Sequence, residues 1–206
     1  MTSNFPLRTN VRHSKKKMRI RTSPFTLVLL LAISYCKSSY SFTLKTSSVV
    51  KGSPEKLYNF IATPENWPSI VASSHSVKKS SIRDNPIDVP FKVGDCVEEV
   101  FGLPPLLPLS VVWECVAADP IRGDLEFYSK DGVPNFARKC SMKFRISGNP
   151  SSNSGKSGDT DEKTNVELEM GYEALNPLVF AATPLLNVDN SLALKVLLPL
   201  AMTKQS

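Results

Sequence analysis

Residues 50–68, VKGSPEKLYNFIATPENWP, begin as a strand, pass through a tight turn and continue as two short helices. Ser53 suits the N-cap position and Pro54 suits the first helical position, so we expect a helix to start there. Thr63 is a second N-cap candidate, before a shorter helix. Residues 44–50, just upstream, predict a strand. The first helix has its apolar side chains at helical spacing: Leu57, Tyr58, Phe60 and Ile61.

Beyond about Ser76 the apolar period changes from 3.6 to 2, which indicates β-strands. In residues 96–101 the pattern is too mixed to assign faces. Four later segments alternate cleanly between an apolar and a polar face, as antiparallel strands do when one side packs on a core: 109–116, 124–130, 138–146 and 165–174. The inward row of these segments contains the candidate cavity-lining residues, which are Trp113, Phe127, Met142, Phe144, Met170 and Tyr172.

The outward rows are charged. Residues 138–146 carry a Lys/Arg row and residues 165–174 carry a Glu row, which would be complementary neighbours if the two strands pair. Between them, residues 148–163 are polar and rich in Gly and Ser, which predicts a flexible loop.

The last segment, residues 176–206, is apolar with helical spacing. Asp189-Asn190-Ser191 resembles a capping sequence, and we expect Pro184 and Pro199 to break or kink the helix. Because polar and charged side chains interrupt the apolar run, we do not expect it to span a membrane. A helix of this kind needs an apolar surface to cover, and the inner face of the sheet is the candidate. The sequence predicts an α+β fold in which a curved antiparallel sheet wraps around a C-terminal helix.

This order of elements resembles the START-like or helix-grip (SRPBCC) superfamily. Residues 50–68 resemble the opening of its polyketide cyclase/dehydrase and coenzyme-Q-binding branches, and residues 93–95 (VGD), 113–116 (WECV) and 119–120 (DP) fit the elements that follow. The resemblance covers nearly all of residues 43–202. It implies an elongated cavity for a sterol, phospholipid, quinone, polyketide or plant hormone. Some members are enzymes and others only carry or sense a ligand, and the matched residues are structural, so the resemblance says little about activity.

The basic character of the chain belongs to its first 41 residues. The chain has a formal charge of +6, but residues 1–41 hold eight bases and no acid, which leaves 17 bases and 19 acids in the rest. A basic stretch, the apolar run 25–33 (FTLVLLLAI) and a small polar exit are typical of a secretory signal peptide, cut near Ser41. An uncleaved membrane anchor is the alternative. The junction Ser39-Tyr40-Ser41-Phe42 resembles that of algae with secondary plastids, so a secreted or ER-lumenal destination and a plastid destination both stay open.

Residues 42–206 are then one ligand-binding domain with Cys96, Cys115 and Cys140, which form no CxxC pair. One disulfide with a free thiol and three buried free thiols are both compatible with this count. One histidine, His75, and three scattered cysteines give no metal-ligand spacing, and we expect no metal and no cofactor. Gly155-Lys156-Ser157 lacks the glycine spacing and the helix of a phosphate-binding loop. Without the leader there is no basic patch, so we expect no nucleic-acid binding.

Acid and base candidates for catalysis are few. We expect His75 to be an exposed loop or strand-end residue, and the glutamates of the clean strands to face solvent; the face of Glu99 is unassigned. Tyr172 lies on the inward row, where it either packs in the core or donates a hydrogen bond to a ligand. No catalytic residue is assigned.

The leading hypothesis from the sequence is a non-enzymatic protein that binds or carries a hydrophobic small molecule, such as a lipid, quinone, isoprenoid or polyketide-like compound. The alternative is an enzyme of the cyclase or dehydratase type, with Tyr172 or an unassigned acid in the pocket. A third hypothesis is an adaptor that holds a partner protein through its outer face or through the apolar bend at residues 103–108 (LPPLLP). Peripheral membrane contact and the oligomeric state stay open.

Overall fold

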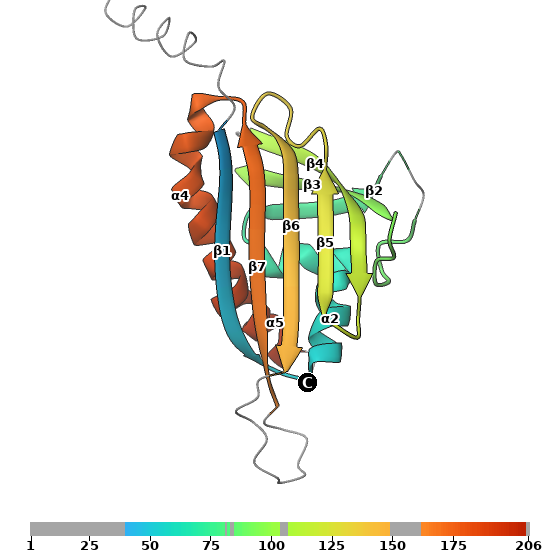
Figure 1. Ribbon diagram of the computed structural model, residues 1–206. Helices are drawn as coiled ribbons and strands as arrows, with labels where there is room; N and C mark the ends of the chain where they lie inside the picture. Colours follow the sequence, from blue (N-terminus) through green and yellow to red (C-terminus); the bar gives the residue numbers. More distant parts are fainter. Residues whose placement is uncertain (1–39, 81, 83–84, 104–106, 149–161, 205–206) are drawn as a thin grey trace, which may run out of the picture. The chain divides into compact units, whose positions relative to one another are not determined.

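A computed structural model describes residues 40–80, 82, 85–103, 107–148 and 162–204 (Figure 1). They belong to one compact unit, Cys36–Ser206, and form a seven-stranded antiparallel sheet with short helices after the first strand and a long C-terminal helix. The predicted α+β helix-grip fold is therefore confirmed. Of the predicted leader only Tyr40 and Ser41 are described, and they already belong to the first strand. Most of the predicted loop at 148–163 lies outside the described residues.

The sheet has the strand order β1-β7-β6-β5-β4-β3-β2, so the first and last strands of the chain are neighbours (Figure 1). All four cleanly alternating segments are strands, with ends shifted by up to three residues. The predicted bend at 103–108 lies between β3 and β4, whose pairing reaches Leu103 and Leu107; residues 104–106 lie outside the described residues. The strands are β1 (Tyr40–Lys51), β2 (Ser74–Lys79), β3 (Cys96–Leu103), β4 (Leu107–Asp119), β5 (Asp124–Ser129), β6 (Ala137–Gly148) and β7 (Lys163–Ala174).

The short helices after β1 are α2 (Pro54–Ala62), the 3₁₀ turn η1 (Pro64–Asn66) and α3 (Trp67–Ile70). Ser53 caps α2 as predicted, because its hydroxyl accepts a hydrogen bond from the Lys56 N–H at 3.2 Å. Thr63 occupies the N-cap position of η1, as predicted, but its side chain does not cap the turn. Its hydroxyl donates backwards to the Asn59 carbonyl at 2.8 Å and is not free to accept from the next turn.

The C-terminal helix runs without a break through α4 (Pro177–Leu192), the π-helical turn η3 (Ala193–Leu197) and α5 (Leu198–Lys204). It starts earlier than the sequence suggested, because Asn176 is the N-cap and accepts from the Leu178 N–H at 2.9 Å. Asp189-Asn190-Ser191 therefore lies inside α4, and its prediction as a cap is wrong. Neither proline ends the helix.

The C-terminal helix runs along β1 and packs against the inner side of the sheet (Figure 1). Phe42 of β1 contacts both Tyr172 of β7 and Phe180 of α4, at ring-centroid distances of 5.4 and 5.1 Å. By length and composition alone Pro177–Lys204 would be able to cross a membrane, with a mean hydropathy of 1.3 over 18 residues. Its inner side is nevertheless part of the core.

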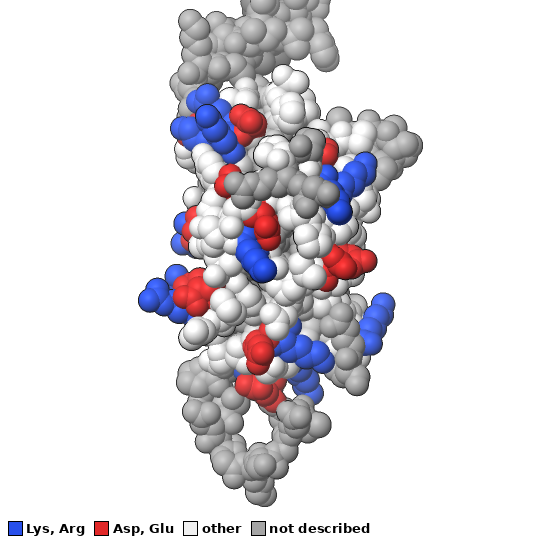
Figure 2. All heavy atoms as spheres, turned by 90° about the vertical axis from the view of Figure 1, so that its right-hand side faces the viewer, with Lys and Arg blue, Asp and Glu red and all other residues white. Residues whose placement is uncertain are grey.

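The outer face of the sheet carries paired charges. Glu173 of β7 accepts from both Arg138 (2.9 Å) and Lys139 (2.7 Å) of β6, so the predicted complementary rows do meet. Figure 2, which views the molecule from the right-hand side of Figure 1, shows acidic and basic side chains interspersed on that side without a continuous basic area. Such a face is suited to solvent.

Candidate functional site

A cavity of about 180 Å³ lies between the inner face of the sheet and the C-terminal helix. Its sheet side takes residues from β3, β4, β6 and β7, and α3 contributes Trp67 and Ile70. Nearly all of these side chains are apolar. The helix contributes Val179, Ala182, Leu186, Asp189, Asn190, Ala193 and Leu194.

Five of the six predicted lining residues reach this cavity, namely Trp113, Met142, Phe144, Met170 and Tyr172. Phe127 is also on the inner face but lies outside the lining. It is completely buried, and its ring contacts Trp67 and Phe91, each at a centroid distance of 5.1 Å. Phe127 therefore belongs to a packed aromatic cluster under α3, and contact with a ligand stays a prediction for the other five.

Glu99 is the residue whose face the sequence left open, and it points inward. In the β3–β4 register Glu99 lies opposite Val111 and Val97 lies opposite Trp113, so Glu99 and Trp113 are diagonal neighbours on the inner face. Glu99 is 8% exposed and lines the cavity. The Trp113 indole Nε1–H donates to its Oε2 at 2.9 Å.

The pKa of the Glu99 carboxyl is raised, chiefly because burial disfavours its charged form. The charge of Asp189 acts in the same direction, and the effects of Trp113 and of the nearby Ser74 hydroxyl oppose it without outweighing it. Ser74 itself is buried, and its hydroxyl makes no hydrogen bond of good geometry to a described residue. The site thus holds a carboxyl group that keeps its proton to a higher pH than a solvent-exposed glutamate does.

Asp189 is the second carboxyl of the cavity. It is held by the Ser73 hydroxyl, which donates to its Oδ2 at 2.5 Å. Sequence reasoning missed it because the run Asp-Asn-Ser resembled a cap. The usable signal was the helical spacing that Asp189 shares with Ala182, Leu186 and Ala193, which places all four on one helix face.

Tyr172 joins the sheet to the helix. Its hydroxyl and that of Thr183 in α4 are 2.8 Å apart, and Thr183 in turn donates to the Val179 carbonyl. Because the single hydroxyl proton of Thr183 is directed to Val179, the Tyr172 hydroxyl is the donor of the pair. Burial raises the pKa of Tyr172. The hydroxyl is therefore already used within the protein.

The other reactive side chains do not add to the site. His75 is exposed on the edge strand β2, with Nε2 at 3.0 Å from the Gly102 carbonyl oxygen. Cys96, Cys115 and Cys140 are buried, no disulfide joins any two of them, and only Cys140 of these three lines the cavity. Among the described residues no group of three or more His, Cys, Asp or Glu side chains is arranged to hold a metal ion.

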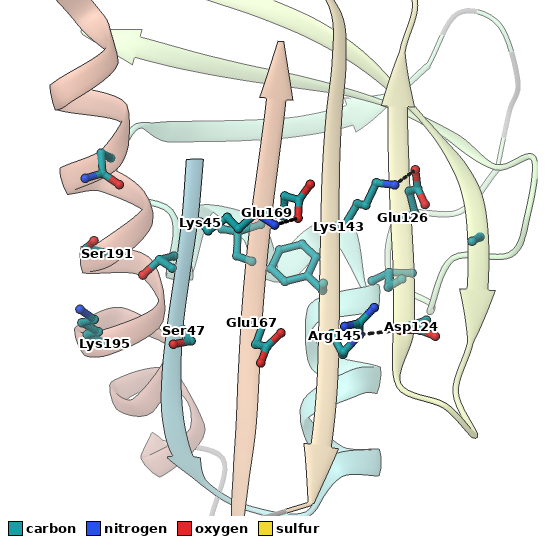
Figure 3. A pocket seen from close by; sticks show the side chains of 16 residues that line it. Lys45, Ser47, Asp124, Glu126, Lys143, Arg145, Glu167, Glu169, Ser191 and Lys195 are labelled. Carbon is teal, nitrogen blue, oxygen red and sulfur yellow. Dashed lines mark hydrogen bonds and ion pairs between the residues drawn. The ribbon is translucent and has the colours of Figure 1, made fainter. Parts of the chain in front are cut away.

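A larger hollow of about 840 Å³ lies beside the outer face of the sheet (Figure 3). Its charged side chains are largely paired: Lys45 with Glu169 (2.7 Å), and Lys143 with Glu126 (2.9 Å). It is wide, open to solvent and polar, so it lacks the enclosure that holds an apolar ligand. The smaller inner cavity is the candidate site.

Comparison with known proteins supports the fold. No protein-family model and no curated protein sequence matches the chain. Similar solved structures include TTHA0849 from Thermus thermophilus (TM-score 0.58, 15% identity, 80% of this chain and 100% of that one). The Zhui aromatase/cyclase from Streptomyces sp. R1128 has a TM-score of 0.56 at 11% identity, covering 81% and 97%. Major latex-like protein 151 from Panax ginseng has a TM-score of 0.50 at 17% identity, covering 74% and 95%.

Proposed function

This chain has the START-like helix-grip fold, and we propose that it binds or carries a hydrophobic small molecule between the sheet and the C-terminal helix. The observation that carries the proposal is the cavity of about 180 Å³. Protein interiors are close-packed and contain few voids larger than a water molecule, so an apolar void of this size suits an apolar guest. Met142 and Met170 line it with flexible side chains that adapt to a guest's shape.

The volume limits the size of the ligand. Pockets for drug-sized molecules hold roughly 300–1,000 Å³, whereas an engineered apolar cavity of about 150 Å³ takes benzene. At about 180 Å³ the present cavity suits a molecule of one or two rings. For a longer quinone, isoprenoid, polyketide or lipid, it suits one end of the molecule.

Native mass spectrometry after gentle purification tests the proposal, with Ala182→Phe as the blocking variant. Ala182 lines the cavity, whereas its neighbour Ala181 is exposed on the same helix, so Ala181→Phe is the matched control. We expect a co-purified apolar molecule in the unmodified protein and in Ala181→Phe but not in Ala182→Phe. Ligand-free protein that also fails to take up small aromatic compounds would contradict the proposal.

A second candidate is an enzyme of the cyclase or dehydratase type, favoured by the two carboxyls in the cavity wall. An acid and a base facing one apolar space suit the loss of water from a β-hydroxy ketone. Asp189 would take the α-proton and Glu99 would give its proton to the departing hydroxyl, which leaves as water as the carbon–carbon double bond forms. One proton transfer from Asp189 to Glu99 then restores the pair.

This candidate is tested with a small aryl β-hydroxy ketone, followed by mass spectrometry for the loss of one water. We expect turnover in the unmodified protein, a drop of at least about a hundredfold in Glu99→Gln, and no drop in Glu98→Gln on the outer face. Binding of the ketone without turnover would leave the protein a carrier. The adaptor hypothesis requires a filled interior. The cavity between sheet and helix contradicts that requirement.

We also propose a peripheral contact between the outer side of the C-terminal helix and an anionic lipid surface. The described charged residues exposed on this helix, Lys195 and Lys204, are both basic, and Asp189 faces the cavity. Apolar stripes flanked by lysine suit the membrane interface, whereas protein hot spots favour Trp, Tyr and Arg. Six exposed apolar residues of the helix recur every three to seven positions and are called the outer stripe: Leu178, Leu185, Val188, Leu192, Val196 and Leu200.

For residues 1–41 we propose a cleaved signal peptide that leads into the secretory route, with secretion and a plastid as alternative ends. Cleavage after Ser41 would remove the first two residues of β1, including Tyr40, whose ring contacts Phe180 at 5.1 Å. Intact-mass analysis of the protein secreted from a eukaryotic host tests this. A mature chain that keeps residues 25–33 would instead support an uncleaved anchor.

A further inference from the structure

Among its described residues, the wall of the cavity includes two carboxyl groups and no positive charge. Its two carboxyls are Glu99 on β3 and Asp189 on α4, and none of its described lining residues is Lys or Arg. Asp189 is satisfied in part by the Ser73 hydroxyl. An anionic ligand, such as a fatty acid carboxylate, would therefore meet two carboxyls without a counter-charge.

Glu99 has unused hydrogen-bonding capacity. Among the described residues, the single hydrogen bond of good geometry to its carboxyl comes from Trp113 and reaches Oε2. The residue is more than nine-tenths buried, and beside it the equally buried Ser74 hydroxyl has no bond of good geometry. A neutral carboxyl group carries an O–H donor, and a buried donor without an acceptor costs about 1–3 kcal/mol. The Ser74 hydroxyl beside it and a ligand in the cavity are the two candidate acceptors.

We infer that the cavity takes an uncharged apolar molecule with one hydrogen-bond acceptor, such as a ketone or aldehyde carbonyl. The Glu99 O–H donates a hydrogen bond to that acceptor. The inference rests on the proposed binding function and names the class of ligand. Asp189 has a positioning role, because its nearby charge favours the neutral form of Glu99. Trp113 holds one carboxyl oxygen, and a ligand would compete with the nearby Ser74 hydroxyl for the remaining hydrogen-bonding capacity of the carboxyl group.

The test compares acetophenone with α-methylstyrene, which is similar in shape and has a C=CH2 group in place of the carbonyl. Both fit the size limit of the cavity. We expect the unmodified protein at acidic pH to bind acetophenone about tenfold more tightly in titration calorimetry, as for one buried hydrogen bond. If neither compound binds, the proposed function fails. If both bind equally well, only the inference about Glu99 fails.

Two variants test whether Glu99 causes the tighter binding of acetophenone. Glu99→Gln keeps an acceptor for Trp113 and an N–H donor for the ligand, so we expect the preference to persist. Glu99→Met has a similar volume and no donor, so we expect the two compounds to bind equally. A preference that survives in Glu99→Met would overturn the inference.

The pH profile provides a test that does not depend on the folding of Glu99→Met. Asp189 is the one charged residue that faces Glu99 across the described cavity wall, and Trp113 and Ser74 are its polar neighbours. As the pH rises through the raised pKa of Glu99, the donor is lost and the carboxylate repels a carbonyl oxygen. We expect the preference for acetophenone to fall with rising pH in the unmodified protein and to stay constant in Glu99→Gln. Parallel profiles in both proteins would contradict the inference.

Discussion

Glu99 places a carboxyl group in the apolar interior with one hydrogen bond of good geometry, from Trp113. Because burial raises its pKa, the folded protein holds this proton to a higher pH than the unfolded chain does. The contribution of Glu99 to stability is therefore greatest at low pH. It falls as the pH rises above the unfolded value of about 4.3 and levels off above the folded value.

This loss of stability with rising pH gives the first prediction. The free energy of unfolding of the unmodified protein, minus that of Glu99→Gln, should fall with rising pH by up to about 1.4 kcal/mol per pH unit. Denaturant unfolding at several pH values measures it, and the subtraction removes the titration of other groups. Glu98→Gln, its neighbour on the outer face, is the control and should give a nearly flat difference. A difference that is flat for both variants would mean that Glu99 is not held neutral.

Cysteine reactivity gives a second prediction at the residue scale. Burial raises the pKa of Cys115 to about 12 and that of Cys140 to about 11. At pH 8 the reactive thiolate is then about one part in ten thousand of Cys115 and one in a thousand of Cys140. We expect iodoacetamide to label neither in the native protein within minutes, and to label both after denaturation without a reductant. Fast native labelling of Cys140, which lines the cavity, would show that the cavity opens to solvent.

A π-helical turn directly precedes Pro199 in the continuous C-terminal helix. In η3 the Leu198 N–H donates to the Ala193 carbonyl, five residues earlier. A proline in an ordinary α-helix clashes with the carbonyl four residues earlier, and the wider turn relieves this. It also keeps Leu198 and Met202 buried in line with Leu194.

The third prediction concerns this turn. Deletion of the half-exposed Val196 converts it to an α-helical turn and restores the clash at Pro199, so stability should fall by about 3 kcal/mol. Deletion of Val196 together with Pro199→Ala should recover most of that loss, and Pro199→Ala alone should change stability by less than about 1 kcal/mol. Thermal and denaturant unfolding measure all three. An equal loss from the deletion in both backgrounds would contradict this role of the turn.

At the scale of elements, the sequence predicted strands and their inward faces best where one face of the strand is wholly apolar. Alternation located β4 to β7 and five of the lining residues, because each of these strands faces the core on one side and water on the other. It left β3 unresolved because Glu99, a carboxyl, occupies an inward position. It misread Asp189 because a carboxyl inside an apolar helix looks like a cap. Polar residues at a candidate site break the very pattern from which faces are predicted.

At the scale of the whole molecule, the C-terminal helix has two apolar sides with different surroundings. One side lines the cavity through residues such as Leu186 and Leu194. The other side carries the outer stripe, whose residues are exposed. The cavity volume follows from how these layers meet and was beyond the reach of side-chain alternation. A helix that rests on a lipid surface while it walls the cavity would bring an apolar ligand close to its source.

The fourth prediction tests that arrangement with vesicles of phosphatidylcholine, with and without phosphatidylserine. Leu185 and Val188 are 69% and 63% exposed, so Leu185→Ser with Val188→Ser should leave stability nearly unchanged but weaken vesicle binding about tenfold or more. Ile121→Ser with Ile82→Ser, at exposed apolar positions elsewhere, is the matched control and should bind like the unmodified full chain.

Lys195→Gln should weaken binding about fivefold on the vesicles with phosphatidylserine and leave binding to neutral vesicles unchanged, because an exposed lysine contributes about 1 kcal/mol at an anionic surface. Co-sedimentation measures each partition coefficient. All variants keep the same basic residues in the first 41 positions, so any difference between them belongs to the helix. Equal partitioning of the stripe variant and its control would exclude lipid as the partner of the outer stripe. If light scattering also showed a dimer that the stripe variant dissociates, a second copy of the chain would be the occupant.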